Sequence, residues 1–139
     1  MDKYLLFLDD DRDPNEVFGY TNDQIYLLKW VVVRNYDEYV KCIIDNGIPD
    51  VISYDHDLGH EHYSVQSNID YSIFKEKTGF HCAKWLINHC IDNKLELPET
   101  ILIHSWNRVG AANIKSLFDT YNKVKDINCD NNYPPIPYS

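Results

Sequence analysis

Aspartates gather directly after two apolar stretches of this chain. Asp9–Asp11 follow the apolar run 4–8, and Asp55 and Asp57 follow the apolar run 51–54. If these runs are neighbouring strands, several carboxylates lie close together, and so many like charges need a cation. Oxygen-only ligation of this kind suits Mg²⁺ or Mn²⁺. We therefore predict a divalent-cation site, Mg²⁺ or Mn²⁺, with solvated loop carboxylates as the alternative.

Two histidines stand at similar positions. His56 lies between two of these aspartates, and His104 follows the apolar run 100–103. Two imidazoles that face one pocket can supply the general acid and the general base of a phosphoester cleavage. We expect them to face one another across the acidic pocket, His56 as the acid because nearby carboxylates favour its cation, and His104 as the base. Asp57 completes the catalytic set, and we expect folding to tolerate the loss of either histidine.

A candidate phosphate site follows the last apolar run. The segment Ser105–Ala111 leads into a helical pattern that begins with small residues. Unpaired backbone N–H groups and the helix dipole at such a start can bind a phosphate. Ser105, Asn107 and Arg108 are therefore candidate phosphate-binding residues, and the Arg108 guanidinium adds further donors. The alternative is an ordinary N-cap at Asn107 followed by a tightly packed helix start.

Apolar runs alternate with helical patterns along the chain. Four runs are typical of strands buried on both faces: residues 4–8, 30–33, 51–54 and 100–103. Asn35, Thr78 and Asn107 can each cap a following helix, and Gly47 ends the first of these helices. This alternation predicts a doubly wound α/β domain with a mostly parallel sheet, in which ligands bind at the carboxyl ends of the strands. Every polar cluster named above lies at such an end.

Three segments lack a clear period. Residues 12–28 predict a loop that can include one short helix, and residues 60–77 predict a long loop of the kind that serves as a lid or binding loop. Residues 126–139 are rich in Asn, Asp and Pro. We therefore expect one domain over residues 1–125 and an irregular tail over residues 126–139.

The composition and net charge of the chain argue against several classes of function. The 139 residues carry a net charge of -9, which argues against an extended nucleic-acid duplex as partner but permits a small phosphorylated ligand, a nucleotide or an RNA end. The only apolar run near the start is short and is followed by acids, so we expect no signal peptide, no membrane span and a cytoplasmic location. Four cysteines without a CxxC pair indicate reduced thiols.

Several of these features resemble the receiver superfamily of response regulators over residues 4 to 121. They are the paired acids after the first run, one acid after the third, a Thr-Gly helix start and a serine after the fourth. Neither Lys123 nor Lys125 ends an apolar run, so the fifth strand and lysine of receivers are not expected. More closely, five blocks are similar to the cyclic-phosphate processing receiver domain: LFLDDDR, WVVVRNYDEYV, ISYDHDLG, TGFHCAKWLI and HSWNRVGAANIKSL.

The resemblance implies a flavodoxin-like receiver scaffold of three layers with a reduced first helix. It also implies that His56 and His104 act on cyclic phosphates and that Asp9, Asp10 and Asp55 lie near a metal. Strand order 2-1-3-4 would bring these three aspartates together at the switch point of the sheet.

Three functions remain open. The first is a metal-assisted phosphoesterase that opens a cyclic phosphate on a nucleotide or an RNA end, with the paired histidines as acid and base. The second is a degenerate receiver that binds or senses a phosphorylated ligand without catalysis, which leaves the two added histidines unexplained. The third is a haloacid-dehalogenase-type phosphatase, because Asp9 and Asp11 form a DxD pair. In that family the second acidic pair follows the Ser/Thr strand, whereas Asp55 and Asp57 precede Ser105.

Overall fold

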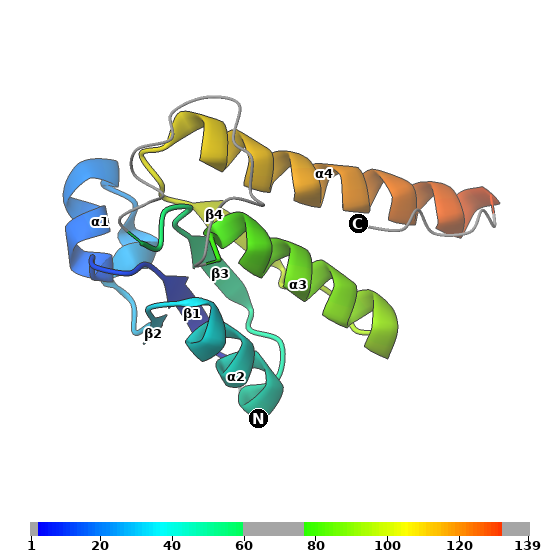
Figure 1. The fold of residues 1–139 in the computed structure, drawn as a ribbon, viewed down its shortest axis with the longest axis horizontal. Coiled ribbons are helices and arrows are strands. Elements are labelled where there is room, and N and C mark those ends of the chain that lie inside the picture. The colour runs from blue at the N-terminus through cyan, green and yellow to red at the C-terminus, as the bar shows by residue number, and fades with distance from the viewer. Residues whose placement is uncertain (1–2, 60–76, 132–139) are drawn as a thin grey trace.

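The computed structural model describes residues 3–59 and 77–131 (Figure 1). Within these residues strands alternate with helices along the chain. The strands are β1 (Leu5–Leu8), β2 (Val31–Val33), β3 (Val51–Tyr54) and β4 (Thr100–Ile103). The helices are α1 (Pro14–Thr21), the 3₁₀ helix η1 (Gln24–Leu27), α2 (Tyr36–Asn46), α3 (Gly79–Asn93) and α4 (Arg108–Asn131).

The strands form one parallel sheet in the order β2-β1-β3-β4. Leu8 pairs with Val33 on one side and with Tyr54 on the other, and Tyr54 pairs with Ile103. The last residues of all these strands therefore lie in one row at the same edge of the sheet. The predicted strand order is confirmed, with β1 and β3 adjacent at the centre. The described residues add no fifth strand to the sheet.

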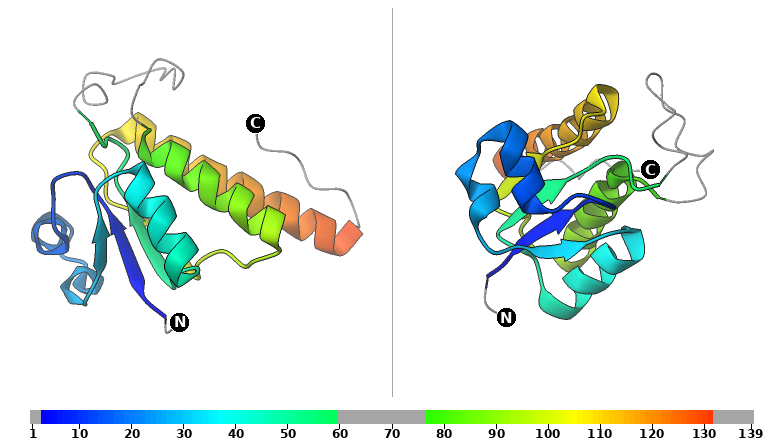
Figure 2. Two further views of the ribbon diagram at one scale, coloured as in Figure 1. Left: turned by 60° about the horizontal axis from the view of Figure 1, so that its bottom comes forward. Right: turned by 90° about the vertical axis from the view of Figure 1, so that its left-hand side faces the viewer.

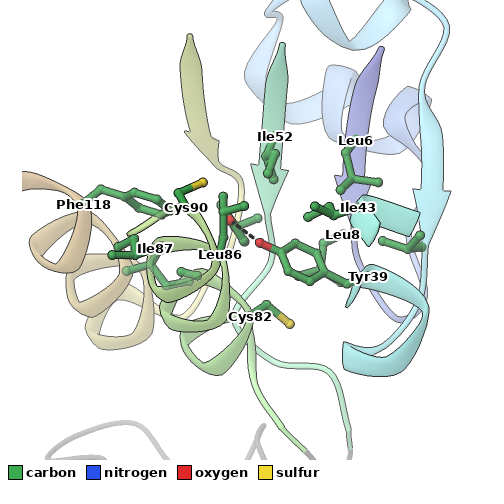
Figure 3. Packing of buried hydrophobic residues seen from close by; sticks show 14 of the residues in the cluster. Leu6, Leu8, Tyr39, Ile43, Ile52, Cys82, Leu86, Ile87, Cys90 and Phe118 are labelled. Carbon is green, nitrogen blue, oxygen red and sulfur yellow. Dashed lines mark hydrogen bonds between the residues drawn. The ribbon is translucent and has the colours of Figure 1, made fainter. Parts of the chain in front are cut away.

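Helices cover both faces of the sheet and give the predicted three layers (Figure 2). Side chains of a strand alternate between the two faces. Leu6 and Leu8 of β1 therefore pack toward α2, α3 and α4, whereas Phe7 packs toward α1 and η1. Figure 3 shows the larger core, in which the hydroxyl groups of Tyr39 and Tyr54 lie 2.7 Å apart. The doubly wound α/β class is confirmed.

The predicted helix ends hold as well. The side chains of Asn35 and Asn107 each accept a hydrogen bond from the backbone N–H of the third residue of the helix that follows. Gly47 ends α2 with a φ of 87°, which favours glycine. The backbone N–H of Gly79 donates to the carbonyl of His56 at 2.8 Å, so the start of α3 is tied to the chain just beyond β3.

The first helical segment is larger than the sequence predicted. Residues 12–28 were expected to be a loop that can include one short helix, and they contain both α1 and η1. Pro14 stands at the first position of α1, and Asp13 with Glu16 forms a capping box there. The apolar side chains in this segment lack a helical period because the helix is short. They still cover one face of the sheet.

The last helix is also longer than predicted. α4 continues to Asn131, so the expectation of an irregular chain after Lys125 is wrong for residues 126–131. No glycine or proline interrupts the chain between Lys125 and Pro134, and Asn and Asp weaken a helix without ending it. The predicted loop over residues 60–77 lies outside the described residues except for Lys77. None of the described helices is long and apolar enough to cross a membrane.

Gly79 is required by close packing at the start of α3. A Cβ at this position would overlap the backbone carbonyl of Asp55, whereas a Cβ at Gly19 in α1 would meet nothing. We predict that Gly79→Ala destabilises the protein by about 1–3 kcal/mol, the usual effect of overpacking. Gly19→Ala is the matched control and should raise stability by about 0.5–1 kcal/mol. Urea unfolding measures both, and an unchanged midpoint for Gly79→Ala would contradict the close packing.

Candidate functional site

The carboxylates that follow β1 and β3 lie in one cluster. The pairing of the two strands continues one residue beyond them, since the backbone N–H of Asp55 donates to the carbonyl of Leu8 at 2.9 Å. Carboxylate oxygens of Asp9, Asp10 and Asp55 all lie within 4.8 Å of one another, and Asp9 and Asp55 are buried. The predicted proximity of these three side chains is therefore confirmed.

Arg12 supplies positive charge to this acidic cluster. Its Nε lies 2.9 Å from Asp9 Oδ2, and its Nη2 lies 3.3 Å from Asp55 Oδ1. The side chain is only 18% exposed, so both ion pairs are largely shielded from water. Burial acts to lower the pKa of Arg12, but the charges of Asp9 and Asp55 outweigh it and the pKa is raised. The guanidinium is therefore charged at any physiological pH.

A second arginine holds the loop that carries Arg12. Arg34 follows β2, the neighbour of β1, and its Nη1 donates to the carbonyl oxygens of Asp9 at 3.1 Å and Arg12 at 2.6 Å. Its Nη2 pairs with Asp13 at 2.6 Å. These bonds fix the backbone after β1 in the shape that turns Arg12 toward Asp55.

Asp9 is fully engaged within the protein. Its Oδ1 accepts from the backbone N–H groups of Asp11 and Arg12, and its Oδ2 accepts from Arg12 Nε and His104 Nε2. These four bonds match the lone pairs that an ionised carboxylate offers. Burial acts to raise the pKa of Asp9, but the bond from His104 and the backbone N–H groups lower it below its usual value. Asp9 is therefore ionised at neutral pH.

Asp55 is only half engaged. Its Oδ1 accepts from the backbone N–H of His56 at 2.9 Å and pairs with Arg12. Its Oδ2 is buried and has no hydrogen-bond partner among the described residues. Burial and the negative charge of Asp9 raise the pKa of Asp55 to about 7, against the opposing charge of Arg12. Buried carboxylate oxygens normally have hydrogen-bond or metal partners, so Asp55 Oδ2 is a candidate atom for binding a ligand.

His104 lies behind Asp9 and is completely buried. Its ring stacks on Phe7 with the centroids 4.5 Å apart, and its Nδ1 lies 2.6 Å from Ser53 Oγ. Burial lowers the pKa of His104 although Asp9 favours its cation, so the ring is neutral near pH 7. Ionised Asp9 can only accept, so Nε2 carries the proton and Nδ1 accepts from Ser53. The Ser53 oxygen in turn accepts from the hydroxyl of Tyr26 at 2.7 Å.

His56 packs beneath α4, on the face of the sheet opposite to the His104 ring. Its Nδ1 lies 2.7 Å from Asp57 Oδ1, which also accepts from Asn107 Nδ2 at 3.1 Å. A Cβ at Gly110 of α4 would overlap the imidazole, so the ring fills the space that this glycine leaves. His56 and Asn107 together fix the carboxylate of Asp57.

A pocket of about 410 Å³ opens beside the acidic cluster. The described residues that line it are Asp11, Arg12, Asp55, Asp57, Ser105, Trp106 and Asn107. Asp10 instead lines a neighbouring pocket of about 500 Å³, together with Arg34 and Lys77. Small-molecule sites usually measure roughly 300–1,000 Å³, so the first pocket has room for a nucleotide-sized ligand.

The structure places the predicted arginine and histidines outside the described lining of this pocket. Arg108 is the exposed first residue of α4, whereas Arg12 lines the pocket, so phosphate binding by Arg108 stays a prediction. The expectation that His56 and His104 face one another across the pocket is wrong. Each ring is buried, on opposite faces of the sheet, and neither is among the described lining residues. Loss of His104 would leave partners in the core unpaired, so the expected tolerance of folding is not supported.

The family model described as the cyclic-phosphate processing receiver domain matches residues 4–120. The chain belongs to this family. The match covers every strand of the sheet and all the residues of the acidic cluster and the pocket. Neither the curated proteins nor the solved structures contain a match to the chain.

Sequence reasoning did not single out three residues of this receiver domain's site. Arg12 directly follows three aspartates, and the need of buried carboxylates for counter-charge was a usable signal. Ser53 is a small polar residue inside a buried strand, which predicts a hydrogen-bond partner such as His104. Nothing in the sequence indicates that Trp106 is exposed at the pocket.

The acidic cluster of this receiver domain fits a divalent cation. The donors are hard carboxylate oxygens, as Mg²⁺ and Mn²⁺ prefer, and Asp55 Oδ2 is buried and without a described partner. Asp9 would have to exchange one of its four hydrogen bonds to join Asp10 and Asp55 as a ligand. The cation itself stays a prediction.

Asp55 makes stability depend on pH when no cation is present. Its pKa is about 7 in the folded protein and about 3.9 in an unfolded chain, so the folded state binds the proton more tightly between these values. The free energy of unfolding should therefore fall as pH rises from about 4 to 7, by up to about 1.4 kcal/mol per pH unit. Urea unfolding at several pH values in chelator measures this slope.

Asp55→Asn is the control for this slope, because it removes the titrating group and keeps the shape. The variant should show a flatter profile between pH 4 and 7. An identical slope in the parent and the variant would place the titration elsewhere.

A divalent cation should stabilise the protein through Asp55 and Asp10. Binding to the folded state alone adds about 2.7 kcal/mol at a hundredfold excess over Kd. Thermal unfolding with Mg²⁺ and with Mn²⁺ should therefore show a higher Tm than in chelator, and Asp55→Asn and Asp10→Asn should each reduce the shift. Asp45→Asn changes an exposed carboxylate on α2 and should keep the full shift. An equal shift in all four proteins would put the cation at another site.

Proposed function

We propose that this receiver domain is a metal-assisted phosphoesterase that opens a cyclic phosphate. The observation that carries the proposal is Asp55, whose Oδ2 is buried without a described partner and which lines a pocket together with Arg12. A carboxylate that holds a cation and an arginine beside it can together bind a phosphate and polarise its P–O bonds. Membership of the cyclic-phosphate processing family supports the choice of phosphate.

The phosphate would lie against Arg12 at the bottom of the pocket. The guanidinium has five N–H donors, of which one each is directed to Asp9, Asp55 and the hydroxyl of Tyr20. Two N–H groups therefore remain without a partner among the described residues and can donate to a phosphate oxygen in the pocket. A divalent cation on Asp55, Asp10 and Asp9 would polarise the phosphate oxygens and assist attack by water. Ser105 and Asn107 line the same pocket at the start of α4 and complete the predicted phosphate contacts.

Asp57 is the pocket residue best placed to act as general base. It lines the pocket, and the buried side chains of His56 and Asn107 hold its Oδ1. Its carboxylate would accept the proton of the attacking water as the new P–O bond forms, and would return it to the leaving ester oxygen as the ring P–O bond breaks. His56 Nδ1, 2.7 Å from Asp57 Oδ1, would stabilise this carboxylate from behind. His56 thus takes part in acid–base chemistry through Asp57. His104 acts as a positioning residue, because its Nε2–H holds Asp9 in the cluster.

The burial of both histidines favours a second candidate, a receiver that binds a phosphorylated ligand without turnover. In that case Arg12 and the cation would hold the phosphate and no group would activate water. The haloacid-dehalogenase hypothesis loses support, because its nucleophile would be Asp9. All the lone pairs of that carboxylate are occupied by hydrogen bonds.

Hydrolysis assays can separate these functions. We expect the parent protein with Mg²⁺ or Mn²⁺ to open adenosine 2′,3′-cyclic or 3′,5′-cyclic monophosphate, as followed by chromatography. Asp57→Asn removes the base and should lower turnover by roughly a hundredfold to ten-thousandfold with little change in stability. Asp45→Asn removes a carboxylate far from the pocket and should keep the parent rate.

Two outcomes would count against the phosphoesterase. A parent protein that binds these ligands in calorimetry but hydrolyses none with either cation would favour the second candidate. Turnover by Asp57→Asn at the parent rate would remove Asp57 from the chemistry.

A further inference from the structure

Trp106 is exposed at the mouth of the pocket. Its side chain is 72% exposed, although Ser105 and Asn107 on either side of it line the pocket with it. Of the described aromatic residues, Trp106 and Tyr20 are the only two that are exposed, and their rings lie in contact. An exposed indole that lines a pocket suggests a ligand with a flat face.

Arg12 and the backbone carbonyl of His104 contact this pair of rings. Their centroids are 5.2 Å apart in an edge-to-face arrangement, and the Arg12 guanidinium lies 5.2 Å from the Trp106 centroid and 5.7 Å from that of Tyr20. The Tyr20 hydroxyl donates to the carbonyl of His104 at 2.8 Å and accepts from Arg12 Nη1 at 2.9 Å. Two hydrogen bonds therefore hold Tyr20, and Trp106 packs against Tyr20 and Arg12 before any ligand binds.

We propose that Trp106 and Tyr20 form a stacking platform for the nucleobase of a mononucleotide cyclic phosphate. The proposal rests on the proposed function, because it takes the phosphate of that ligand to lie against Arg12. The same guanidinium contacts both Asp55 and Trp106, so the platform begins one side chain away from the phosphate position. Stacking on an aromatic ring tolerates any base, since every base has a π-face.

The platform accommodates one base rather than a strand. The net charge of -9 opposes a long polyanion, and the pocket of about 410 Å³ is of mononucleotide size. Beyond Trp106 and Tyr20, the described residues present no exposed aromatic ring that could take a neighbouring base. Arg12 and a divalent cation on the acidic cluster would together balance the charge of the phosphate, so the net charge of the protein does not prevent a mononucleotide from binding.

Calorimetry on the Asp57→Asn protein with Mg²⁺ tests the platform without the need for turnover. The probes are adenosine 2′,3′-cyclic monophosphate and glycerol 1,2-cyclic phosphate, which has the same ring but no base. We expect the nucleotide to bind roughly 5- to 150-fold more tightly, the range that one stacked base provides. Adding Trp106→Ala should remove this preference and leave the glycerol probe unchanged, whereas adding Trp106→Phe should keep most of it. Leu28→Ala, at an exposed apolar residue outside the lining set, is the control and should keep all of it.

Several results would overturn the platform. They are equal affinity for the two probes, no binding of either, or an equal loss for both probes on Trp106→Ala. A dinucleotide with the same cyclic end should bind within about twofold of the mononucleotide, because a second base adds no stacking contact. Tenfold tighter binding of the dinucleotide would overturn the mononucleotide assignment in favour of an RNA end. If the parent protein hydrolyses no cyclic phosphate, the proposed function fails, yet the two affinities still decide whether the platform exists.

Discussion

Two buried carboxylates share one guanidinium at the centre of this structure. Asp9 and Asp55 follow neighbouring parallel strands, and the backbone bond from Asp55 to Leu8 leaves them no freedom to move apart. Arg12 reaches both, at 2.9 Å and 3.3 Å, and balances one charge. Burial and the remaining negative charge raise the pKa of Asp55 to about 7, and its buried Oδ2 has no hydrogen-bond partner among the described residues. A fold that imposes this imbalance has to bind either a proton or a cation.

The rest of the site is arranged around that imbalance. On one face of the sheet, Tyr26 and Ser53 orient His104, which holds Asp9. On the other face, His56 and the start of α4 hold Asp57 at the pocket. Arg34 fixes the loop that turns Arg12 inward. The two histidines therefore set the positions of the carboxylates of Asp9 and Asp57, and Asp57 rather than either imidazole is among the described residues that line the pocket.

Local sequence signals were sufficient to predict most of the helices and strands and the acidic cluster. The sheet was predicted from the apolar runs and from the caps at Asn35 and Asn107. Its acidic edge was predicted from the aspartates at the ends of the first and third runs. They could do so because strand ends of a parallel sheet meet at one edge whatever the loops do. The helix α4 extended further than predicted, because polar composition alone does not end a helix.

The side on which each histidine lies could not be predicted in the same way. Tyr54 pairs with Ile103, so His104 comes level with Asp55 and shares its face, while His56 lies one residue further on and turns away. A shift of one residue in register would reverse this, and no local pattern fixes the register. Arg12 rather than Arg108 lines the pocket because of the path of the loop after β1. Arg34 fixes this path from a distant part of the chain.

The most direct test of this account is anomalous diffraction from crystals grown with Mn²⁺. We expect a manganese peak in direct contact with Asp55 Oδ2 and with Asp10, with Arg12 still paired to the cluster. A manganese-saturated crystal without a peak at the cluster, and with Asp55 Oδ2 hydrogen-bonded to a protein donor, would contradict the account.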